Sequence, residues 1–248
     1  MKLRTRSSSP RLTFLGTRGE IPLRSRRHWR HSSLLIRLAN ARVMVDCGTD
    51  WLNRVDEIAP TAIVLTHAHE DHAAGLRNGS PCPVYATRAT WQPLRRFPIA
   101  DRHTLPLRRE TLVDGVRFEP FQVDHSMRAP AVGFKISVGH QRIFYVPDVA
   151  RIRNAAAALR GVGLYIGDGA TLKHSMVRQK AGTTIGHAPI IAQLRWCAKA
   201  GVRSAMFTHC GSGIVRDRHG ELDTVLARLA AEQGIQACIA SDGDEIVL

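Results

Sequence analysis

A dense cluster of histidine and carboxylate side chains constrains this chain more than any other feature of its sequence. His67, His69, Asp71 and His72 lie within six residues, directly after the apolar run 61–66. The run predicts a buried strand, and the residues after it predict the start of a helix. Nitrogen and oxygen donors at this spacing can point into one small volume, as a borderline metal ion such as zinc requires. The cluster therefore predicts a metal site.

Three further side chains of the same kinds each follow an apolar run that predicts a strand. They are His125, Asp148 and His209. Taken alone, each fits a surface residue as well as a ligand, but side chains at the ends of neighbouring strands can converge on one cleft. Together with the cluster they predict a site for two metal ions. Two divalent ions about 3.5–4 Å apart can hold a bridging hydroxide and stabilise the attacking and leaving oxygens of a displacement, which suits phosphoesters.

The composition is that of a globular protein with one substantial core. The chain has 248 residues, of which 44% are hydrophobic and 23% charged, and these values exclude disordered, collagen-like and coiled-coil chains. No stretch approaches the roughly 18 apolar residues of a membrane span, and no apolar segment follows the basic N-terminus as in a secretory signal. The five cysteines lie far apart, which argues against a disulfide framework or a cysteine-based zinc site. We expect a cytoplasmic protein with no membrane partner.

The order of the expected elements favours an α/β fold built on two packed sheets. Repeats and low-complexity linkers are absent, so residues 11–248 are expected to form one domain behind a flexible basic tail, residues 1–10. Strands are expected at 11–16, 33–39, 42–46, 61–66, 116–124, 132–138, 141–146, 162–167, 203–208, 235–240 and 244–248, and helices at 51–58, 72–78, 87–96, 151–160, 187–200 and 221–233. Hairpins mixed with helix-connected strands imply sheet packed on sheet, with helices on the outer faces.

The cluster and the order of the later residues resemble the metallo-β-lactamase superfamily. The resemblance covers nearly the whole chain and implies a four-layer αββα sandwich, two mixed β-sheets flanked by helices. The metal ligands that it implies are His67, His69 and His125 at the first site, Asp71, His72 and His209 at the second, and Asp148 bridging both. It also implies that Asp46, which ends a hairpin strand, supports the metal loop. Two divalent ions are the implied cofactor, with zinc favoured and manganese as an alternative.

Other motifs resemble the ribonuclease Z and PhnP-type phosphodiesterases of this superfamily. They are the turn Gly16-Thr-Arg-Gly19 ahead of a basic loop, Gly186-His187 at the start of an expected helix, and the ending Ser241-Asp-Gly-Asp-Glu-Ile. The resemblance implies that His187 acts near the scissile phosphate, where a protonated histidine can give the leaving alkoxide its proton. Asp71 and Asp148 would orient the attacking hydroxide, so these three residues are the expected catalytic set.

Two departures from those phosphodiesterases leave the substrate open. His125 and Asp148 are only 23 residues apart, which leaves no room for the tRNA-binding arm of ribonuclease Z. The N-terminal cysteines that often hold an extra zinc in the PhnP type are absent. We therefore expect a PhnP-like architecture without a defined substrate.

The positive charge of the chain gives a further indication of the substrate. Lysine and arginine number 35 against 21 acids, a net charge of +14, and nine of these cations lie between Lys2 and Arg30. A genome that favours arginine codons explains this charge as well as polyanion binding does, but a basic loop near the cleft of a hydrolase would attract phosphate. Arg26, Arg27 and Arg30 are therefore candidates for substrate contact, with a simply solvated loop as the alternative. His174 is a further candidate, because it lies in a long loop that could overhang the cleft.

These observations predict a dinuclear metal-dependent hydrolase, a phosphodiesterase that acts on a cyclic or nucleotide-like phosphodiester. Its partner would be a phosphorylated small molecule or a nucleic acid, and a homodimer is an open alternative to a monomer. Hydrolysis of a lactone, thioester or carboxylic ester on the same metals is the alternative chemistry, and an RNA- or DNA-processing nuclease is an alternative within phosphodiester chemistry. A nucleic-acid-binding protein with a vestigial metal site is a third hypothesis. Salt-sensitive binding of nucleic acid without cleavage would favour it.

Overall fold

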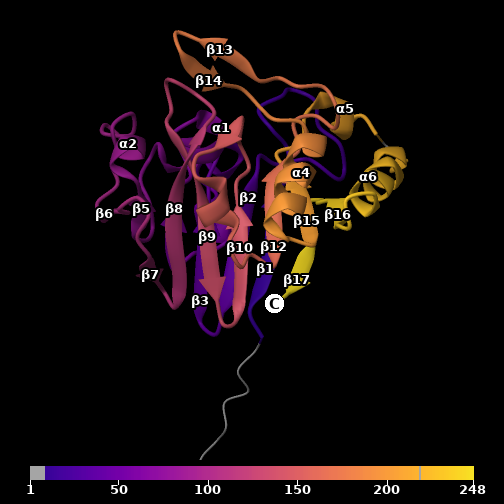
Figure 1. Ribbon diagram of the computed structural model, residues 1–248. Coiled ribbons are helices and arrows are strands. Elements are labelled where there is room, and N and C mark those ends of the chain that lie inside the picture. Colours follow the sequence, from indigo (N-terminus) through magenta and orange to yellow (C-terminus); the bar gives the residue numbers. More distant parts are fainter. Residues whose placement is uncertain (1–8, 218) are drawn as a thin grey trace, which may run out of the picture.

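Two β-sheets packed face to face form the centre of the computed structural model, which describes residues 9–217 and 219–248 (Figure 1). In spatial order, the first sheet contains β17 (Glu245–Val247), β1 (Arg11–Gly16), β2 (Ser33–Leu38), β3 (Ala41–Val45), β4 (Ala62–Val64), β5 (Val84–Ala86) and β6 (Arg102–Thr104). The second contains β11 (Arg151–Ile152), β8 (Val116–Asp124), β9 (Ala131–Val138), β10 (Gln141–Tyr145), β12 (Leu164–Asp168), β15 (Ser204–Thr208) and β16 (Gln236–Ile239), with β7 (Thr111–Val113) beside β8. A separate hairpin pairs β13 (Arg178–Lys180) with β14 (Thr183–Ile185).

Both sheets are mixed, because hairpin strands on one side give way to helix-connected strands on the other. In the first sheet β17, β1, β2 and β3 pair antiparallel, whereas β3, β4, β5 and β6 pair parallel. In the second sheet the antiparallel run from β11 to β10 continues as the parallel run β10, β12, β15 and β16. This confirms the two mixed sheets that the sequence predicted.

Three apolar clusters hold four layers together. The cluster between the sheets joins side chains such as Phe14 and Ile36 of the first sheet to Phe118 and Phe134 of the second. The helical elements that cover the outer faces are η1 (Thr49–Trp51), η2 (Val55–Glu57), α1 (Glu70–Ala73), η3 (Ala74–Leu76) and α2 (Arg88–Trp91) on the first sheet, and α3 (Ala155–Leu159), α4 (Ile190–Ala200) and α6 (Glu221–Ala231) on the second. A further short helix, α5 (Ser212–Val215), follows β15. The layers are those of the predicted αββα sandwich.

Helix α4 shows how local sequence sets these layers. Its buried residues Ile190, Gln193, Leu194 and Cys197 recur at the spacing of one helical face, which packs on the second sheet. Pro189 precedes its first turn, where a missing N–H costs nothing, and Gly201 ends it in the left-handed conformation with φ +76°. In the described part of the chain, neither this helix nor any other has the length and apolar character needed to cross a bilayer.

Several elements differ from those expected. The helix expected at 51–58 is two short 3-10 helices, and the one expected at 87–96 ends at Trp91 because Pro93 lacks an N–H and disfavours helical geometry before it. Six strands were not expected, β5, β6, β7, β11, β13 and β14, because each has only two or three residues, too few for an alternating apolar pattern. β11 occupies the start of the helix expected at 151–160, and α3 begins only at Ala155. The tail expected at 1–10 lies outside the described residues except for its last two.

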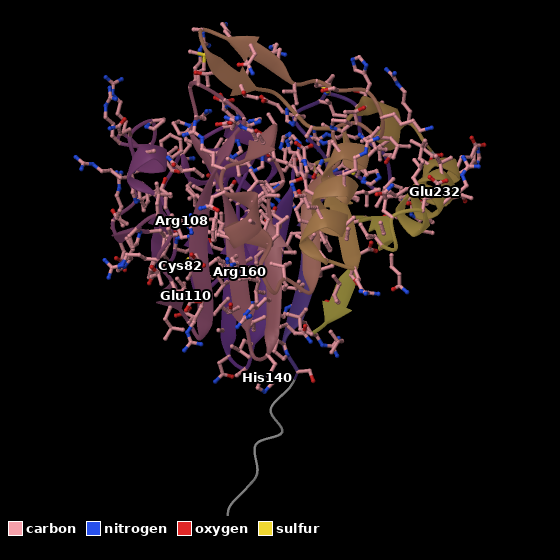
Figure 2. The ribbon with its side chains drawn as sticks, viewed as in Figure 1. Cys82, Arg108, Glu110, His140, Arg160 and Glu232 are labelled. Atoms are coloured by element: carbon pink, nitrogen blue, oxygen red, sulfur yellow. The ribbon has the colours of Figure 1, made fainter. Side chains whose placement is uncertain are left out.

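The carboxyl ends of several strands meet at one edge of the sandwich. β10, β12 and β15 are parallel, and β8 runs in the same direction because β9 lies antiparallel between β8 and β10. His125, Asp148 and His209 follow β8, β10 and β15, and His67 follows β4 of the first sheet. At the opposite end of the sandwich lie tight turns such as the one at His140 (Figure 2). The topology therefore gathers the chemically active side chains at one edge.

The basic loop between β1 and β2 is fixed by a buried ion pair. The Arg18 guanidinium, almost fully buried, donates to Asp50 Oδ2 at 2.9 Å, and Arg24 donates to Asp50 Oδ1 at 2.9 Å. The backbone N–H of His31 also donates to Asp50 Oδ2, at 2.8 Å. Burial opposes ionisation of this carboxyl, but the hydrogen bonds from His31 and the charge of Arg18 hold the pKa of Asp50 well below its usual range. Asp50 is thus the anchor of the loop.

Replacing Asp50 by alanine should therefore destabilise the protein strongly. Asp50→Ala leaves the Arg18 charge buried without its partner, which costs about 3–5 kcal/mol in the free energy of unfolding. Urea denaturation at pH 7, followed by circular dichroism, measures the loss. The matched control is Asp56→Ala, because Asp56 is exposed and makes no ion pair in the described residues. Its effect should stay within about 0.5 kcal/mol, and equal stabilities of the two variants would refute the anchoring role.

Candidate metal centre

Three histidines direct ring nitrogens toward one point. His67 Nε2 lies 3.0 Å from His69 Nδ1, and His69 Nδ1 lies 3.2 Å from His125 Nε2. The other nitrogens of two of these rings are engaged: His67 Nδ1 is 3.0 Å from Thr66 Oγ1, and His125 Nδ1 donates to the Gly186 carbonyl at 3.3 Å. Burial lowers the pKa of His67 well below its usual value and that of His125 to about 4. These are neutral imidazoles, the form that ligates a metal ion.

A second group lies beside the first and contains carboxylates. Asp71 Oδ2 is 3.2 Å from both His72 Nε2 and His209 Nε2. Asp71 and His72 are placed by the first turn of α1, whereas His209 comes from the end of β15 in the other sheet. The group therefore joins the two sheets across their common edge.

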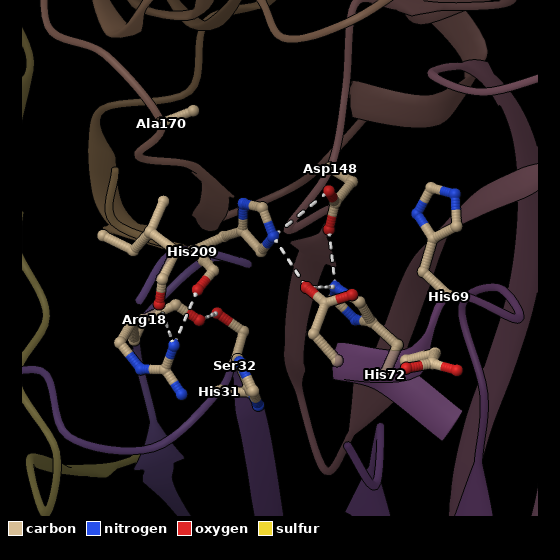
Figure 3. Close-up of polar contacts among 12 residues, drawn as sticks. Arg18, His31, Ser32, His69, His72, Asp148, Ala170 and His209 are labelled. Carbon is tan, nitrogen blue, oxygen red and sulfur yellow. Dashed lines mark hydrogen bonds and ion pairs between the residues drawn. The ribbon is translucent and has the colours of Figure 1, made fainter. Parts of the chain in front are cut away.

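Asp148 lies between the two groups (Figure 3). Its Oδ2 is 2.9 Å from His72 Nε2, and its Oδ1 is 3.3 Å from His209 Nε2 and 3.4 Å from His125 Nε2. One carboxylate thus contacts a histidine of the first group and two of the second. This is the place that a residue bridging two metal ions must occupy.

The chemistry of these donors fits metal ions. Asp71 Oδ1 is buried and has no hydrogen-bond partner in the described chain. His72 Nε2 and Asp148 Oδ2 are also buried, and they form ion-pair contacts but no aligned hydrogen bond. Burial disfavours a charged His72, but the carboxylates of Asp71, Asp148 and Asp46 outweigh it and raise the pKa of His72 well above its usual value. The same excess of buried negative charge would be met by a divalent cation, and imidazole nitrogens with carboxylate oxygens are a donor set that zinc and manganese accept.

Asp46 lies behind this centre and contacts one of its histidines, and its support of the metal loop stays a prediction. Its side chain is fully buried, and Oδ2 accepts a hydrogen bond from His72 Nδ1 at 2.9 Å. Oδ1 accepts from the backbone N–H of Thr66 at 2.8 Å. Because His72 Nδ1 carries the proton that Asp46 accepts, His72 Nε2 is left to face the centre.

Asp168 is a functional candidate that the sequence reasoning missed. It ends β12, is fully buried, and its Oδ2 accepts from His187 Nδ1 at 2.7 Å and from the backbone N–H of Val149 at 2.9 Å. Burial opposes a charge on His187, but Asp168 raises the pKa of His187 to about 9. Like Asp148, Asp168 is an acid at a strand end, and this shared position is the signal that identifies it.

Two cavities open on the centre, and His187 lines both. The smaller, of about 450 Å³, is lined by Gly19, Glu20, Ile21, His69, Asp71, His125, Asp148, Ala170, Thr171, Met176, His187, His209, Gly211, Ser212 and Gly213. The larger, of about 570 Å³, is lined by His69, His125, Ser126, Met127, Arg128, Met176, Arg178, Lys180, Ile185, Gly186 and His187. A substrate that reaches the predicted ligands would therefore also meet His187.

The other residues expected to bind substrate lie outside these two cavities. Arg26 and Arg27 line a separate cavity with Arg216, and Arg27 forms an ion pair of 2.7 Å with Asp223. Arg30 lies over the ring of Trp51. His174 is exposed on the loop after β12. The structure does not bring these four residues together with the centre, and their contact with substrate stays a prediction.

Comparison with known proteins agrees with this geometry. The family model described as "Beta-lactamase superfamily domain" matches residues 41–210, a segment that runs from β3 to just past His209. Ribonuclease Z of Kineococcus radiotolerans is 25% identical over 268 aligned residues, which cover 93% of this chain and 82% of that protein. Ribonuclease Z of Methanopyrus kandleri is 37% identical over 70 residues, but that match spans only 26% of this chain and 24% of the relative.

Solved structures share the fold over almost the whole chain. Zinc-bound PqqB from Methylobacterium extorquens superposes with a TM-score of 0.73 at 20% identity, covering 96% of this chain and 100% of that chain. A diphosphatase from the PhnP family gives a TM-score of 0.69 at 19% identity, covering 96% of both. The chain therefore belongs to the metallo-β-lactamase superfamily of metal-dependent hydrolases, as its sequence motifs predicted, and its sequence is similar to ribonuclease Z.

Proposed function

We propose that the protein is a phosphodiesterase that binds two divalent metal ions. The observation that carries this proposal is the pairing of His187 with Asp168 beside Asp148, because it sets a proton donor next to the residues that would hold the two cations. Relatives named ribonuclease Z and a fold neighbour named as a diphosphatase of the PhnP family support the same class of chemistry.

Each of the two groups of side chains described above would hold one metal ion. His67, His69 and His125 would hold one ion, and Asp71, His72 and His209 the other, with Asp148 shared. Zinc is the favoured metal, and manganese is the alternative. When bound, two such ions stabilise the charge that develops on the attacking and leaving oxygens of a phosphodiester.

His187 would deliver the proton to the leaving oxygen. Its Nδ1 is held by Asp168, so Nε2 is the ring nitrogen left for the substrate. Asp168 is itself fixed by the backbone N–H groups of Val149 and Ala170, which keeps the imidazole in one orientation. Asp71 and Asp148 would orient the attacking water on the other side of the phosphate. His187, Asp71 and Asp148 all line the smaller cavity.

A substrate panel tests the proposed reaction. The protein should hydrolyse bis(p-nitrophenyl) phosphate, lose that activity on dialysis against a chelator, and regain it with zinc or manganese. An acyl-homoserine lactone and a glutathione thioester should be turned over at least about a hundredfold more slowly in kcat/KM, because neither carries the phosphate that two cations stabilise. Turnover of the lactone or thioester without the phosphodiester would replace our proposal with the ester-hydrolase alternative. Salt-sensitive nucleic-acid binding without any turnover would favour a nucleic-acid-binding protein with a vestigial metal site.

Replacing His187 tests the proton donor. His187→Ala should lower kcat by about 10²–10⁴-fold for thymidylyl-thymidine, whose leaving alkoxide needs a proton. The loss should be much smaller for bis(p-nitrophenyl) phosphate, because nitrophenolate leaves without one. Metal content, measured by mass spectrometry, serves as the control and should stay at the wild-type level. Equal losses on both substrates, or a parallel loss of metal, would contradict the role.

Replacing Asp46 tests the support of the centre. Asp46→Asn removes the negative charge that orients His72. Replacing a residue that hydrogen-bonds a metal ligand typically lowers metal affinity by about 10–100-fold. We expect the variant to lose metal at a correspondingly lower concentration of a competing chelator. Asp56→Asn makes the same chemical change at an exposed position and should behave as wild type. Wild-type metal retention in Asp46→Asn would show that Asp46 does not support the ligands.

A further inference from the structure

The β13–β14 hairpin stands above the metal edge of the sandwich (Figure 1). Its base is tied to two site residues. The backbone N–H of Gly186 donates to the His125 carbonyl at 2.8 Å, and the N–H of Met176 donates to the His187 carbonyl at 3.1 Å. Gly186 has φ +101°, and a Cβ there would collide with the Met176 carbonyl, so this base accepts only glycine. The hairpin is therefore fixed relative to His125 and His187.

The hairpin and the loop after β8 enclose the larger cavity, which has a distinctive charge. Arg128 comes from the loop, and Arg178 and Lys180 come from β13. The described residues that line the cavity include no aspartate or glutamate. Within residues 9–217 and 219–248, none of these three cations lies within ion-pairing distance of a carboxylate, in contrast to Arg24 and Arg27 of the N-terminal loop. A group of unpaired cations beside one opening attracts an anion.

The same cavity also has an apolar side. Met127 and Met176 are 48% and 43% exposed, which is unusual for large apolar side chains of this protein, and both line the cavity with Ile185. Flexible thioether side chains pack well against aromatic rings. The volume of about 570 Å³ is ample for one nucleotide. Cations and exposed methionines in one cavity suit a ligand that carries both a phosphate and a planar base.

We propose that this cavity binds a nucleotide unit next to the scissile phosphodiester. Its base would lie against Met127 and Met176, and its further phosphate would be held by Arg128, Arg178 and Lys180. The inference rests on the proposed phosphodiesterase function and narrows its substrate class to nucleotide diesters that carry a second phosphate one nucleotide from the bond cleaved. His69, His125 and His187 line the same cavity, so a nucleotide bound there adjoins the reacting phosphate.

Dinucleotides that differ only in a terminal phosphate test this subsite. Thymidylyl-thymidine has no second phosphate, whereas its 5′-phosphorylated and 3′-phosphorylated forms each have one. The wild-type protein should prefer one phosphorylated form over the plain dinucleotide by about tenfold or more in kcat/KM, the size expected for charge-assisted hydrogen bonds. In Arg178→Gln/Lys180→Gln the preference should fall to within about twofold.

A matched control removes the same charge elsewhere. Arg195→Gln/Lys199→Gln changes two exposed cations of α4 that line neither cavity, and it should keep the wild-type preference. A preference that survives in the hairpin variant, or that disappears equally in both variants, overturns the subsite. A decamer of thymidylate distinguishes the source of the second phosphate: turnover of the decamer above that of both phosphorylated dinucleotides places the substrate in a polynucleotide, and the reverse places it in a small nucleotide.

A binding measurement separates this inference from the proposed reaction. Thymidine 3′,5′-bisphosphate should bind the metal-free protein in isothermal titration calorimetry at least about tenfold more tightly than it binds Arg178→Gln/Lys180→Gln. Met127→Gln/Met176→Gln should weaken binding of the bisphosphate but not binding of inorganic pyrophosphate, because pyrophosphate has no base. If wild-type protein hydrolyses no phosphodiester yet shows these binding differences, only the proposed function fails. If the wild-type protein hydrolyses bis(p-nitrophenyl) phosphate, and the wild type and all variants bind the bisphosphate equally well, only the subsite fails.

Discussion

Buried carboxylates at one edge of the sandwich determine much of this structure. Asp46, Asp71, Asp148 and Asp168 are almost fully excluded from solvent, and such charges cost several kcal/mol each unless partners compensate them. Each contacts an imidazole: Asp46 and Asp71 contact His72, Asp148 contacts His72 and His209, and Asp168 contacts His187. The network satisfies the charges in part, and the oxygens and nitrogen left without hydrogen bonds point toward the place for cations. Strand ends, loop anchors and helix starts around this edge serve to hold these groups in position.

The sequence revealed the main part of this site because its residues occupy positions that sequence can read. Four donors lie in six residues after a strand, and Asp148 and His209 each follow an apolar run of their own. Asp168 was not predicted although it ends a strand in the same way, because the one histidine close to it in the chain, His174, is not its partner in the fold. His187, its partner, lies 19 residues later, and only the fold brings the two together. Short exposed strands such as β6 were not predicted for a different reason, because three exposed residues show no alternating apolar pattern.

The net charge has a different meaning once the fold is known. The N-terminal arginines drew attention because they are dense in the sequence, yet Arg18, Arg24 and Arg27 are each paired with a carboxylate. Pairing across the fold cannot be read from a run of like charges. Arg178 and Lys180, which stand apart in a polar segment without an evident motif, face the larger cavity instead. What matters for binding an anion is which cations lack partners at the site, and this is set by tertiary structure.

The placement of the hairpin separates the chemistry from the choice of substrate. Hydrogen bonds tie its base to His125 and His187, so a change there would disturb the centre. Its turn, Ala181 and Gly182, has positive φ at both residues, as a two-residue hairpin turn of type I′ requires, and a Cβ at Gly182 would contact nothing. The tip and the exposed strand residues can therefore vary in charge or length without moving a metal ligand. Under the proposed function, one metal edge could then serve different phosphodiesters through changes in the connection between β12 and α4, residues 169–189.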